Sequence, residues 1–128
     1  MLRFLSNNRM TKFFLSTIYK PNKKLSISLF GSNFIHPFGL AAGMDKKGEA
    51  INGWESIGLS FAEIGGVTML EQLGNPKPRM FRSSKYKALV NRMGFNNPGS
   101  EKMQHSLEKH YNKFGKPGIP IWINLGKS

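Results

Sequence analysis

Three largely apolar runs lie along the chain, at residues 37–43, 61–67 and 119–125. Short runs of this kind, without strict apolar and polar alternation, are typical of strands buried on both faces. Helical patterns separate the first run from the second and the second from the third. Strands that alternate with helices form a parallel sheet. The chain is therefore predicted to have an α/β fold.

Both connecting helices have an apolar side and a clear end. The first is expected over 50–57, with Ile51, Trp54 and Ile57 on one side, and it ends at Gly58. The second is expected to use Asn97 as its cap and Pro98 as its first residue. Its apolar positions recur at helical spacing, and Gly115 and Pro117 follow it; they are Met103, Leu107, Tyr111 and Phe114.

Before these units lies a basic segment, residues 1–24, in a chain whose first acidic residue is Asp45. Its apolar side chains form one helical stripe: Met10, Phe13, Phe14 and Ile18. Such a helix can lie in a membrane interface, act as a mitochondrial targeting segment, or pack on its own domain. Residues 25–35 follow as a small hairpin that turns at 31–33. The stretch 70–97 is predicted to be a long functional loop.

Composition excludes several classes of protein. The absence of cysteine excludes disulfide scaffolds, Cys-based zinc sites, iron–sulfur clusters and a cysteine nucleophile. No apolar run reaches the roughly 20 residues of a membrane-spanning helix. A net charge of +12 favours an anionic partner, so a non-enzymatic basic module that binds nucleic acid or an anionic membrane remains the alternative function. Nucleic acid itself is not expected, because the aromatic residues fall mostly at core-facing spacings.

Two apparent motifs fail on spacing. Residues 126–128 read Gly-Lys-Ser, but a P-loop also needs glycine at position 121, where the chain has Ile121. His105 and His110 are five residues apart on a helix, so they face different directions and are expected to be solvated rather than to bind a metal. No metal site is predicted.

Polar residues gather where strands end, in the segments 41–48, 91–97 and 124–127. Ligands of parallel sheets bind at this edge, where Asp45, Lys46 and Gly66 are expected. Small residues allow a flat ligand to approach the backbone, Lys46 supplies a cation, and the amides of Asn91 and Asn124 both donate and accept hydrogen bonds. This combination suits a planar heterocycle with imide edges.

The same segments resemble the dihydroorotate dehydrogenase family. The resemblance covers residues 25–128, and Asn-Arg-Met-Gly-Phe-Asn-Asn at 91–97 is similar to the membrane-associated, quinone-reducing class; the matching segments are 40–48, 63–65, 74–82, 91–97 and 124–127. It implies an incomplete (β/α)8 TIM barrel, made of the first three βα units and preceded by an N-terminal helix and a β-hairpin. It also implies FMN-mediated oxidation of dihydroorotate to orotate in pyrimidine biosynthesis, with a quinone as electron acceptor.

Site residues follow from the resemblance by motif position. FMN is expected to contact Ala42, Gly43, Lys46, Gly66 and Asn124. Dihydroorotate or orotate is expected to contact Lys46, Asn91, Arg92, Met93, Gly94 and Phe95. The family usually has threonine at the position of Gly66, and Thr68 could supply the missing hydroxyl. Lys46 can stabilise negative charge on the reduced flavin or on the substrate carboxylate.

No catalytic residue is assigned within the chain. The resemblance implies a serine as the catalytic base, and that serine is expected beyond Ser128. Ser128 itself is not that serine by position. Because about eight strands close a barrel of this kind, the 128-residue chain alone is expected to be inactive.

The resemblance also bears on location. In this class an N-terminal helical element docks on the membrane and admits quinone. Residues 1–24 are therefore expected to associate peripherally with the bacterial inner membrane on its cytoplasmic face, or with the mitochondrial inner membrane in a eukaryote. Residues 25–128 are expected to be the N-terminal portion of an FMN-binding barrel.

Overall fold

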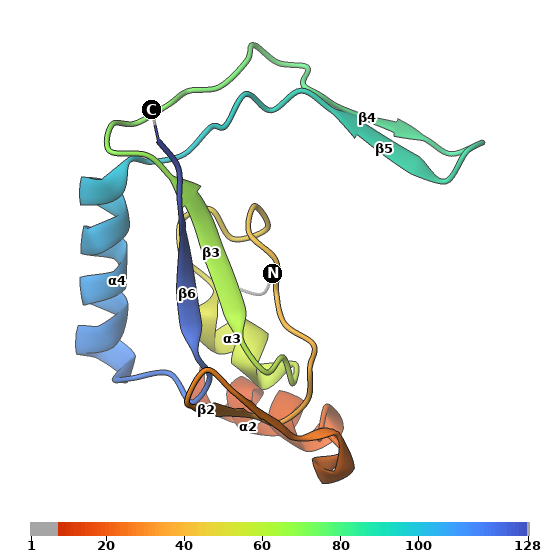
Figure 1. Ribbon diagram of the computed structural model, residues 1–128, viewed down its shortest axis with the longest axis vertical. Helices are drawn as coiled ribbons and strands as arrows, with labels where there is room; N and C mark the ends of the chain where they lie inside the picture. The colour runs from red at the N-terminus through yellow and green to blue at the C-terminus, as the bar shows by residue number, and fades with distance from the viewer. Residues whose placement is uncertain (1–7, 128) are drawn as a thin grey trace.

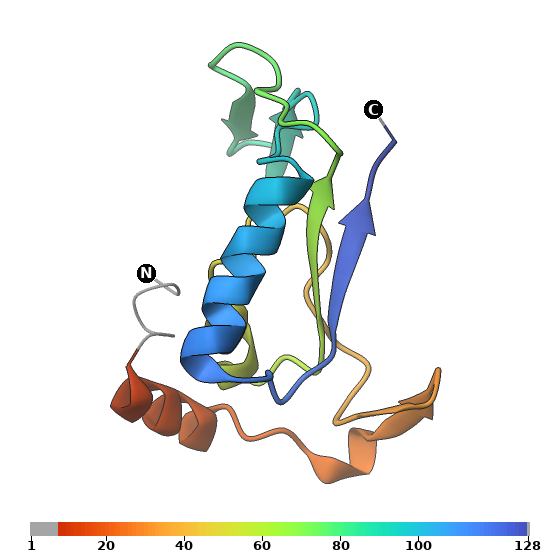
Figure 2. The ribbon, with the colours of Figure 1, turned by 90° about the vertical axis from the view of Figure 1, so that its left-hand side faces the viewer.

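A computed structural model describes residues 8–127 of the chain (Figure 1). At its centre two strands, β3 (Ala62–Val67) and β6 (Ile121–Leu125), pair in parallel, with Ala62 opposite Ile121. Helix α4 (Ser100–Phe114) makes the crossover between them and lies along the pair (Figure 2). The prediction of an α/β fold with parallel strands is confirmed for this part.

A small apolar core holds α4 against the strands. Ile64 and Val67 of β3 pack on Met103 of α4, and all three are almost fully buried. Leu107 and Ile121 complete the cluster at its edge. The other two residues of the expected helical stripe, Tyr111 and Phe114, remain 40% and 36% exposed. The amphipathic pattern thus predicts the core contacts of the N-terminal half of α4 correctly, but not those of its C-terminal half.

The run 37–43 does not form the buried strand that the sequence predicts. Only Leu40 makes a parallel bridge, to Ala62 of β3, and Ala41 and Gly43 are exposed. A strand buried on both faces needs neighbours that cover it, and among the described residues this run has only β3 beside it. The helix after it, α3 (Ile51–Ser56), is confirmed, with Ile51 fully buried.

The stretch 70–97 contains a second hairpin where a loop was predicted. Strand β4 (Met80–Ser83) pairs antiparallel with β5 (Ala88–Asn91), and the hairpin projects away from the central strands (Figure 1). The sequence signal for this hairpin is weak, because each strand contains a single strong strand former, Phe81 in β4 and Val90 in β5.

The first hairpin is confirmed with a shifted turn. Strands β1 (Ile27–Leu29) and β2 (Ser32–Phe34) follow a short 3-10 helix, η1 (Lys23–Leu25). The turn consists of Phe30 and Gly31, both with positive φ, rather than residues 31–33.

Helix α2 (Arg9–Ile18) confirms the N-terminal helix expected from the apolar stripe. Asn8 caps it by accepting a hydrogen bond from the Met10 amide at 2.9 Å. The helix lies against α3, where Lys12 Nζ bonds Glu55 Oε2 at 3.0 Å. Its stripe faces outward, with Phe13 and Phe14 76% and 64% exposed. Across residues 8–127, every helix is too short or too polar to cross a membrane.

Candidate functional site

Segments far apart in the sequence surround a cavity of about 590 Å³ beside the end of β3. One wall is the 40–46 segment, and the other is formed by Met80 and the end of β5 with the residues after it. The lining residues are Leu40, Ala41, Ala42, Gly43, Met44, Lys46, Met80, Asn91, Met93, Gly94 and Phe95. Seven of the predicted site residues are among them: Ala42, Gly43, Lys46, Asn91, Met93, Gly94 and Phe95.

The first wall is fastened to β3 by backbone hydrogen bonds. Gly43 donates to the Gly65 carbonyl at 2.7 Å, and Gly65 donates to the Asp45 carbonyl at 3.2 Å. Gly43 has φ +95 and no atom within 4 Å of an added Cβ, so glycine keeps the backbone bare where it faces open space. A flat ligand could therefore approach this backbone closely.

Asp45 fixes the 40–46 segment on the side away from the cavity. Its carboxylate is buried and accepts three hydrogen bonds, from the amides of Glu49 and Ala50 at 3.0 and 2.9 Å and from Trp54 Nε1 at 3.1 Å. These bonds satisfy the start of α3 and point the carboxylate away from the cavity. Asp45 therefore acts as a structural residue that positions its neighbour, Lys46.

Lys46 is the cation of the cavity. Its Nζ donates to the side-chain oxygen of Asn96 at 3.0 Å and to the Asn96 carbonyl at 3.3 Å, which joins the two walls. Burial, and secondly the positive charge of Arg79, lower the pKa of Lys46 below its usual value of 10.5. Both effects disfavour the ammonium form, and an anionic ligand in the cavity would favour it again.

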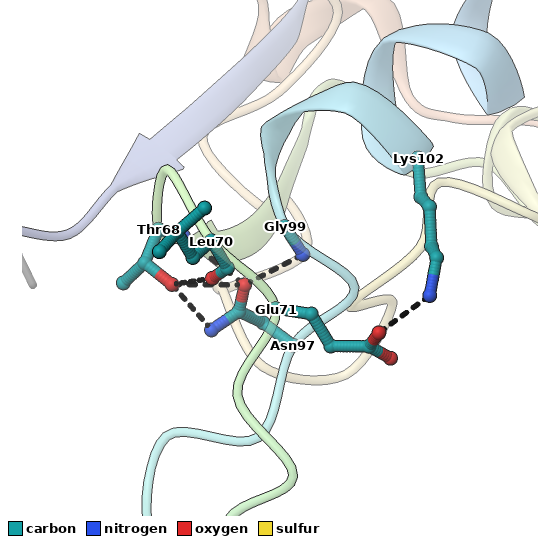
Figure 3. Close-up of polar contacts among 6 residues, drawn as sticks. All are labelled: Thr68, Leu70, Glu71, Asn97, Gly99 and Lys102. Atoms are coloured by element: carbon teal, nitrogen blue, oxygen red, sulfur yellow. Dashed lines mark hydrogen bonds and ion pairs between the residues drawn. The ribbon is translucent and has the colours of Figure 1, made fainter.

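The second wall is held by Asn97, which ends the 70–97 stretch and bonds to Thr68 just before the start of that stretch (Figure 3). Its Oδ1 accepts from the amides of Thr68 and Gly99, and its Nδ2 donates to Thr68 Oγ1 and to the Phe95 carbonyl. The helix cap is Gly99, so the prediction that Asn97 caps α4 is wrong. Its amide instead joins the predicted substrate loop to Thr68, the residue directly after β3.

The Thr68 hydroxyl, which could supply the contact missing at position 66, has partners within the protein. It donates to the Leu70 carbonyl at 2.6 Å and lies 3.2 Å from Asn97 Oδ1, and the residue is buried. The hydroxyl is thus engaged within the loop. The contacts with Asn97 hold the Thr68 hydroxyl in this position, and no local sequence pattern around Thr68 predicts them.

Three predicted site residues lie outside the cavity wall. Arg92 is exposed, and its guanidinium donates to the Pro78 carbonyl at 3.3 Å. Asn124 donates to Glu63 Oε1 at 2.8 Å, and its Oδ1 lies 3.0 Å from where a Cβ on Gly66 would be. Gly66 and Asn124 therefore lie side by side on the paired strands. Glycine at position 66 leaves space for the Asn124 amide.

Two predictions fall on parts of the chain outside the described residues 8–127. Ser128 lies outside the described part. The expectation that the family's catalytic serine lies beyond Ser128, and is not Ser128 itself, therefore stays a prediction. The first seven residues of the expected membrane-associating segment, 1–7, also lie outside the described part. The structural account of that segment therefore rests on α2 and the residues after it.

Sequence reasoning missed several contributors to the site. Leu40, Met44 and Met80 line the cavity, and Asn96 accepts from Lys46. Met80 belongs to the hairpin that was predicted to be a loop, and Asn96 lies inside the segment 91–97 but was given no role. Within residues 8–127, no three His, Asp or Glu side chains lie close enough together to hold a metal ion.

A family model described as dihydroorotate dehydrogenase matches residues 24–128. The chain belongs to the dihydroorotate dehydrogenase family. Among curated relatives, dihydroorotate dehydrogenase (quinone) of Gloeobacter violaceus is 48% identical over 108 residues, which are 84% of this chain and 29% of the relative. The enzyme of that name from a strain of Thermus thermophilus is 48% identical over 105 residues, 82% of this chain and 30% of the relative.

Solved structures of family members have a fold similar to that of this chain. The dihydroorotate dehydrogenase of Eimeria tenella in complex with ferulenol superposes with a TM-score of 0.75 at 35% identity, over 93% of this chain and 34% of that chain. The ligand-free form of the Eimeria tenella enzyme gives 0.75 at 33% identity, over 97% of this chain and 37% of that chain. The chain thus spans about a third of the length of its relatives. What it shows of the barrel is partial: β3, β6 and the bridge at Leu40.

Proposed function

We propose that this chain provides part of the active site of a quinone-dependent dihydroorotate dehydrogenase, which oxidises dihydroorotate to orotate. The observation that carries the proposal is the shared cavity. It brings Ala42, Gly43 and Lys46 of one segment together with Asn91 and the residues after it. These groups are separated by more than 40 residues in the sequence, and they combine a bare backbone, a cation and an amide.

The residues present fit a flavin and a pyrimidine in different ways. The backbone at Ala42 and Gly43 allows a planar ring system to lie against it, since no side chain intervenes beyond a methyl group. Bound FMN would supply the two-electron chemistry that connects dihydroorotate to a quinone. Gly66 and Asn124, next to each other on the paired strands, are proposed to contact FMN from the strand ends.

The substrate side of the proposal rests on Lys46 and the 91–95 loop. Lys46 would exchange its contact with Asn96 for the carboxylate of dihydroorotate, whose charge favours the ammonium form. The Asn91 amide can donate to and accept from the pyrimidine edge. Met93, Gly94 and Phe95 would enclose the ring, and Arg92, which faces outward, is proposed to support the loop through Pro78.

The exposed stripe of α2 supports peripheral membrane association, with residues 1–24 as the membrane-associating segment and 25–128 as the barrel portion. Met10, Phe13, Phe14 and Ile18 are all more than half exposed. Apolar rings on a basic segment can enter a membrane interface beside anionic headgroups. The same face would give a membrane quinone access to the protein.

The test is orotate and FMN binding by the 128-residue chain and two matched variants. Lys46→Ala removes the cavity cation, and Lys47→Ala makes the same change in charge at the adjacent position, which does not line the cavity. We expect Lys46→Ala to weaken orotate binding at least about tenfold and Lys47→Ala to leave it unchanged. Isothermal titration with orotate, and fluorescence titration with FMN, measure both.

The same titration has a pH signature. Because the pKa of Lys46 is lowered, orotate binding by the wild-type chain should weaken as pH rises, with a midpoint below 10.5. Equal affinities of the two variants for orotate, or wild-type binding that does not depend on pH, would contradict the proposal.

A further inference from the structure

A second cavity, of about 370 Å³, lies between α4 and residues 48–49, and it shares no lining residue with the proposed active site. Figure 2 looks onto α4, one wall of this cavity. That wall carries mainly basic side chains, and the lining residues are Gly48, Glu49, Lys102, His105, Ser106, Lys109, His110, Lys113 and Phe114. We call it the α4 cavity.

The spacing of the basic residues concentrates charge in one place. His105, Lys109 and Lys113 follow each other at intervals of four residues, which places them on one face of α4. Like charges at this spacing destabilise a helix in water. The Lys109–Lys113 pair therefore costs a little stability, which a bound anion would offset.

Among residues 8–127, few groups neutralise this face of α4. Lys102 is paired with Glu71, and Lys113 Nζ lies 5.0 Å from the centre of the Phe114 ring. The side chains of Lys109 and His105 have no hydrogen bond or ion pair with any residue in the described range 8–127. Glu49 contributes one carboxylate to the opposite wall. Among the described residues, the lining therefore has three lysines against one carboxylate, and one of these lysines, Lys102, is already paired.

A buried polar atom without a partner lies in the same wall. His110 is 9% exposed, and its Nε2 is buried without a hydrogen-bond partner in the described part of the chain. Burial and the nearby Lys12 lower the pKa of His110, so the ring is neutral near neutral pH. Buried polar atoms in proteins are almost always hydrogen-bonded, so Nε2 needs a water or another polar group. The charged neighbours of this ring are Lys12 and Glu55, and His110 is not one of the phosphate-binding groups.

We infer that the α4 cavity binds a phosphate group, held by Lys109, Lys113, Ser106 and His105. Two lysines give charge-assisted hydrogen bonds to phosphate oxygens, and a hydroxyl and an imidazole add further donors. The phosphate can belong to a soluble phosphorylated compound or to a phospholipid headgroup. This site is separate from the proposed active site and does not depend on that proposal.

The probe is inorganic phosphate, titrated into the full 128-residue chain labelled with ¹⁵N, at constant ionic strength in chloride. We expect saturable shifts of the Ser106, Lys109 and Lys113 amides. The double variant Lys109→Gln, Lys113→Gln should weaken binding at least about tenfold. Lys85→Gln, which removes an exposed charge on the distant β4–β5 hairpin, should leave it unchanged. Backbone spectra establish that each variant is folded.

Vesicles distinguish the two sources of phosphate. If the ligand is a headgroup, the double variant binds phosphatidylglycerol vesicles more weakly than Lys85→Gln does. If it is a soluble compound, the two variants bind these vesicles alike, and only the double variant loses phosphate binding. The inference is overturned if phosphate causes no saturable shift on α4, or if Lys85→Gln weakens binding as much as the double variant.

Discussion

Asp45 and Lys46 are adjacent in the sequence, yet they serve opposite sides of one loop. The carboxylate of Asp45 is buried in three hydrogen bonds below the loop, whereas Lys46 reaches across the cavity to Asn96. Because the partners of the Asp45 carboxylate all lie inside the protein, Asp45 fixes the backbone of the loop. Lys46 lines the cavity and has a lowered pKa, so it is available to a ligand. The pair shows how a structural residue supports a candidate binding residue.

The structural role of Asp45 predicts a large effect on stability. Asp45→Ala leaves the amides of Glu49 and Ala50 and the Trp54 Nε1 group without their acceptor, and we expect a loss of about 3 kcal/mol in the free energy of unfolding. Urea denaturation followed by circular dichroism measures it. Glu101→Gln, at an exposed position on α4, is the control and should cost less than about 1 kcal/mol. Similar losses in both variants would refute the assigned role.

At the scale of elements, α4 shows that two faces of one helix serve different purposes. Met103 and Leu107 bind it to β3 and β6, and its lysines line a separate cavity. His110 was expected to be solvated but is buried, because its side of α4 is near Lys12 of α2 and Glu55 of α3. Both His105 and His110 line the α4 cavity, but His105 is exposed and His110 is buried. Helical spacing predicts only that the two residues lie at different angles around α4. It does not reveal that other helices cover one of them.

The burial of His110 predicts a pH dependence of stability. Its pKa in the folded chain is lowered, so the unfolded chain takes up the proton first, and stability falls as pH decreases below about 6.5. Lys12 strengthens this effect and Glu55 opposes it. We expect His110→Phe to reduce the loss between pH 7.5 and pH 5, measured by thermal unfolding. His105→Gln, at an exposed position, is the matched control, and a reduction of equal size there would contradict the assignment to His110.

At the scale of the whole molecule, much apolar surface is left open. Besides the α2 stripe, Leu125 of β6 is 78% exposed and Phe95 is 83% exposed. Exposed apolar surface of this extent marks places where another surface binds. In the family to which the chain belongs, relatives are about three times longer. The open surface near β6 and the cavity is consistent with a barrel of which this chain shows only part.

The exposed apolar stripe of α2 predicts how the whole molecule binds to a membrane. Replacing both Phe13 and Phe14 by serine removes the exposed rings, and we expect binding to anionic vesicles to weaken by at least about tenfold. Phe30→Asn, at a ring that is 86% exposed on the β1–β2 turn, is the control. Vesicle sedimentation at low and high salt measures the effect, since the basic residues make binding sensitive to salt. Unchanged binding of the double variant would disprove membrane docking through α2.

Local patterns determined the elements of this protein. Apolar stripes located α2, α3 and α4, two of the three apolar runs became β3 and β6, and the family motifs identified seven residues of one cavity. These features depend on spacing and residue type, which the sequence contains directly. Neighbours decided the rest. The run 37–43 forms a single bridge because only β3 lies beside it among residues 8–127, and Asn97 holds a loop instead of capping a helix. Burial and hydrogen bonding between distant segments are tertiary properties, and no local pattern specifies them.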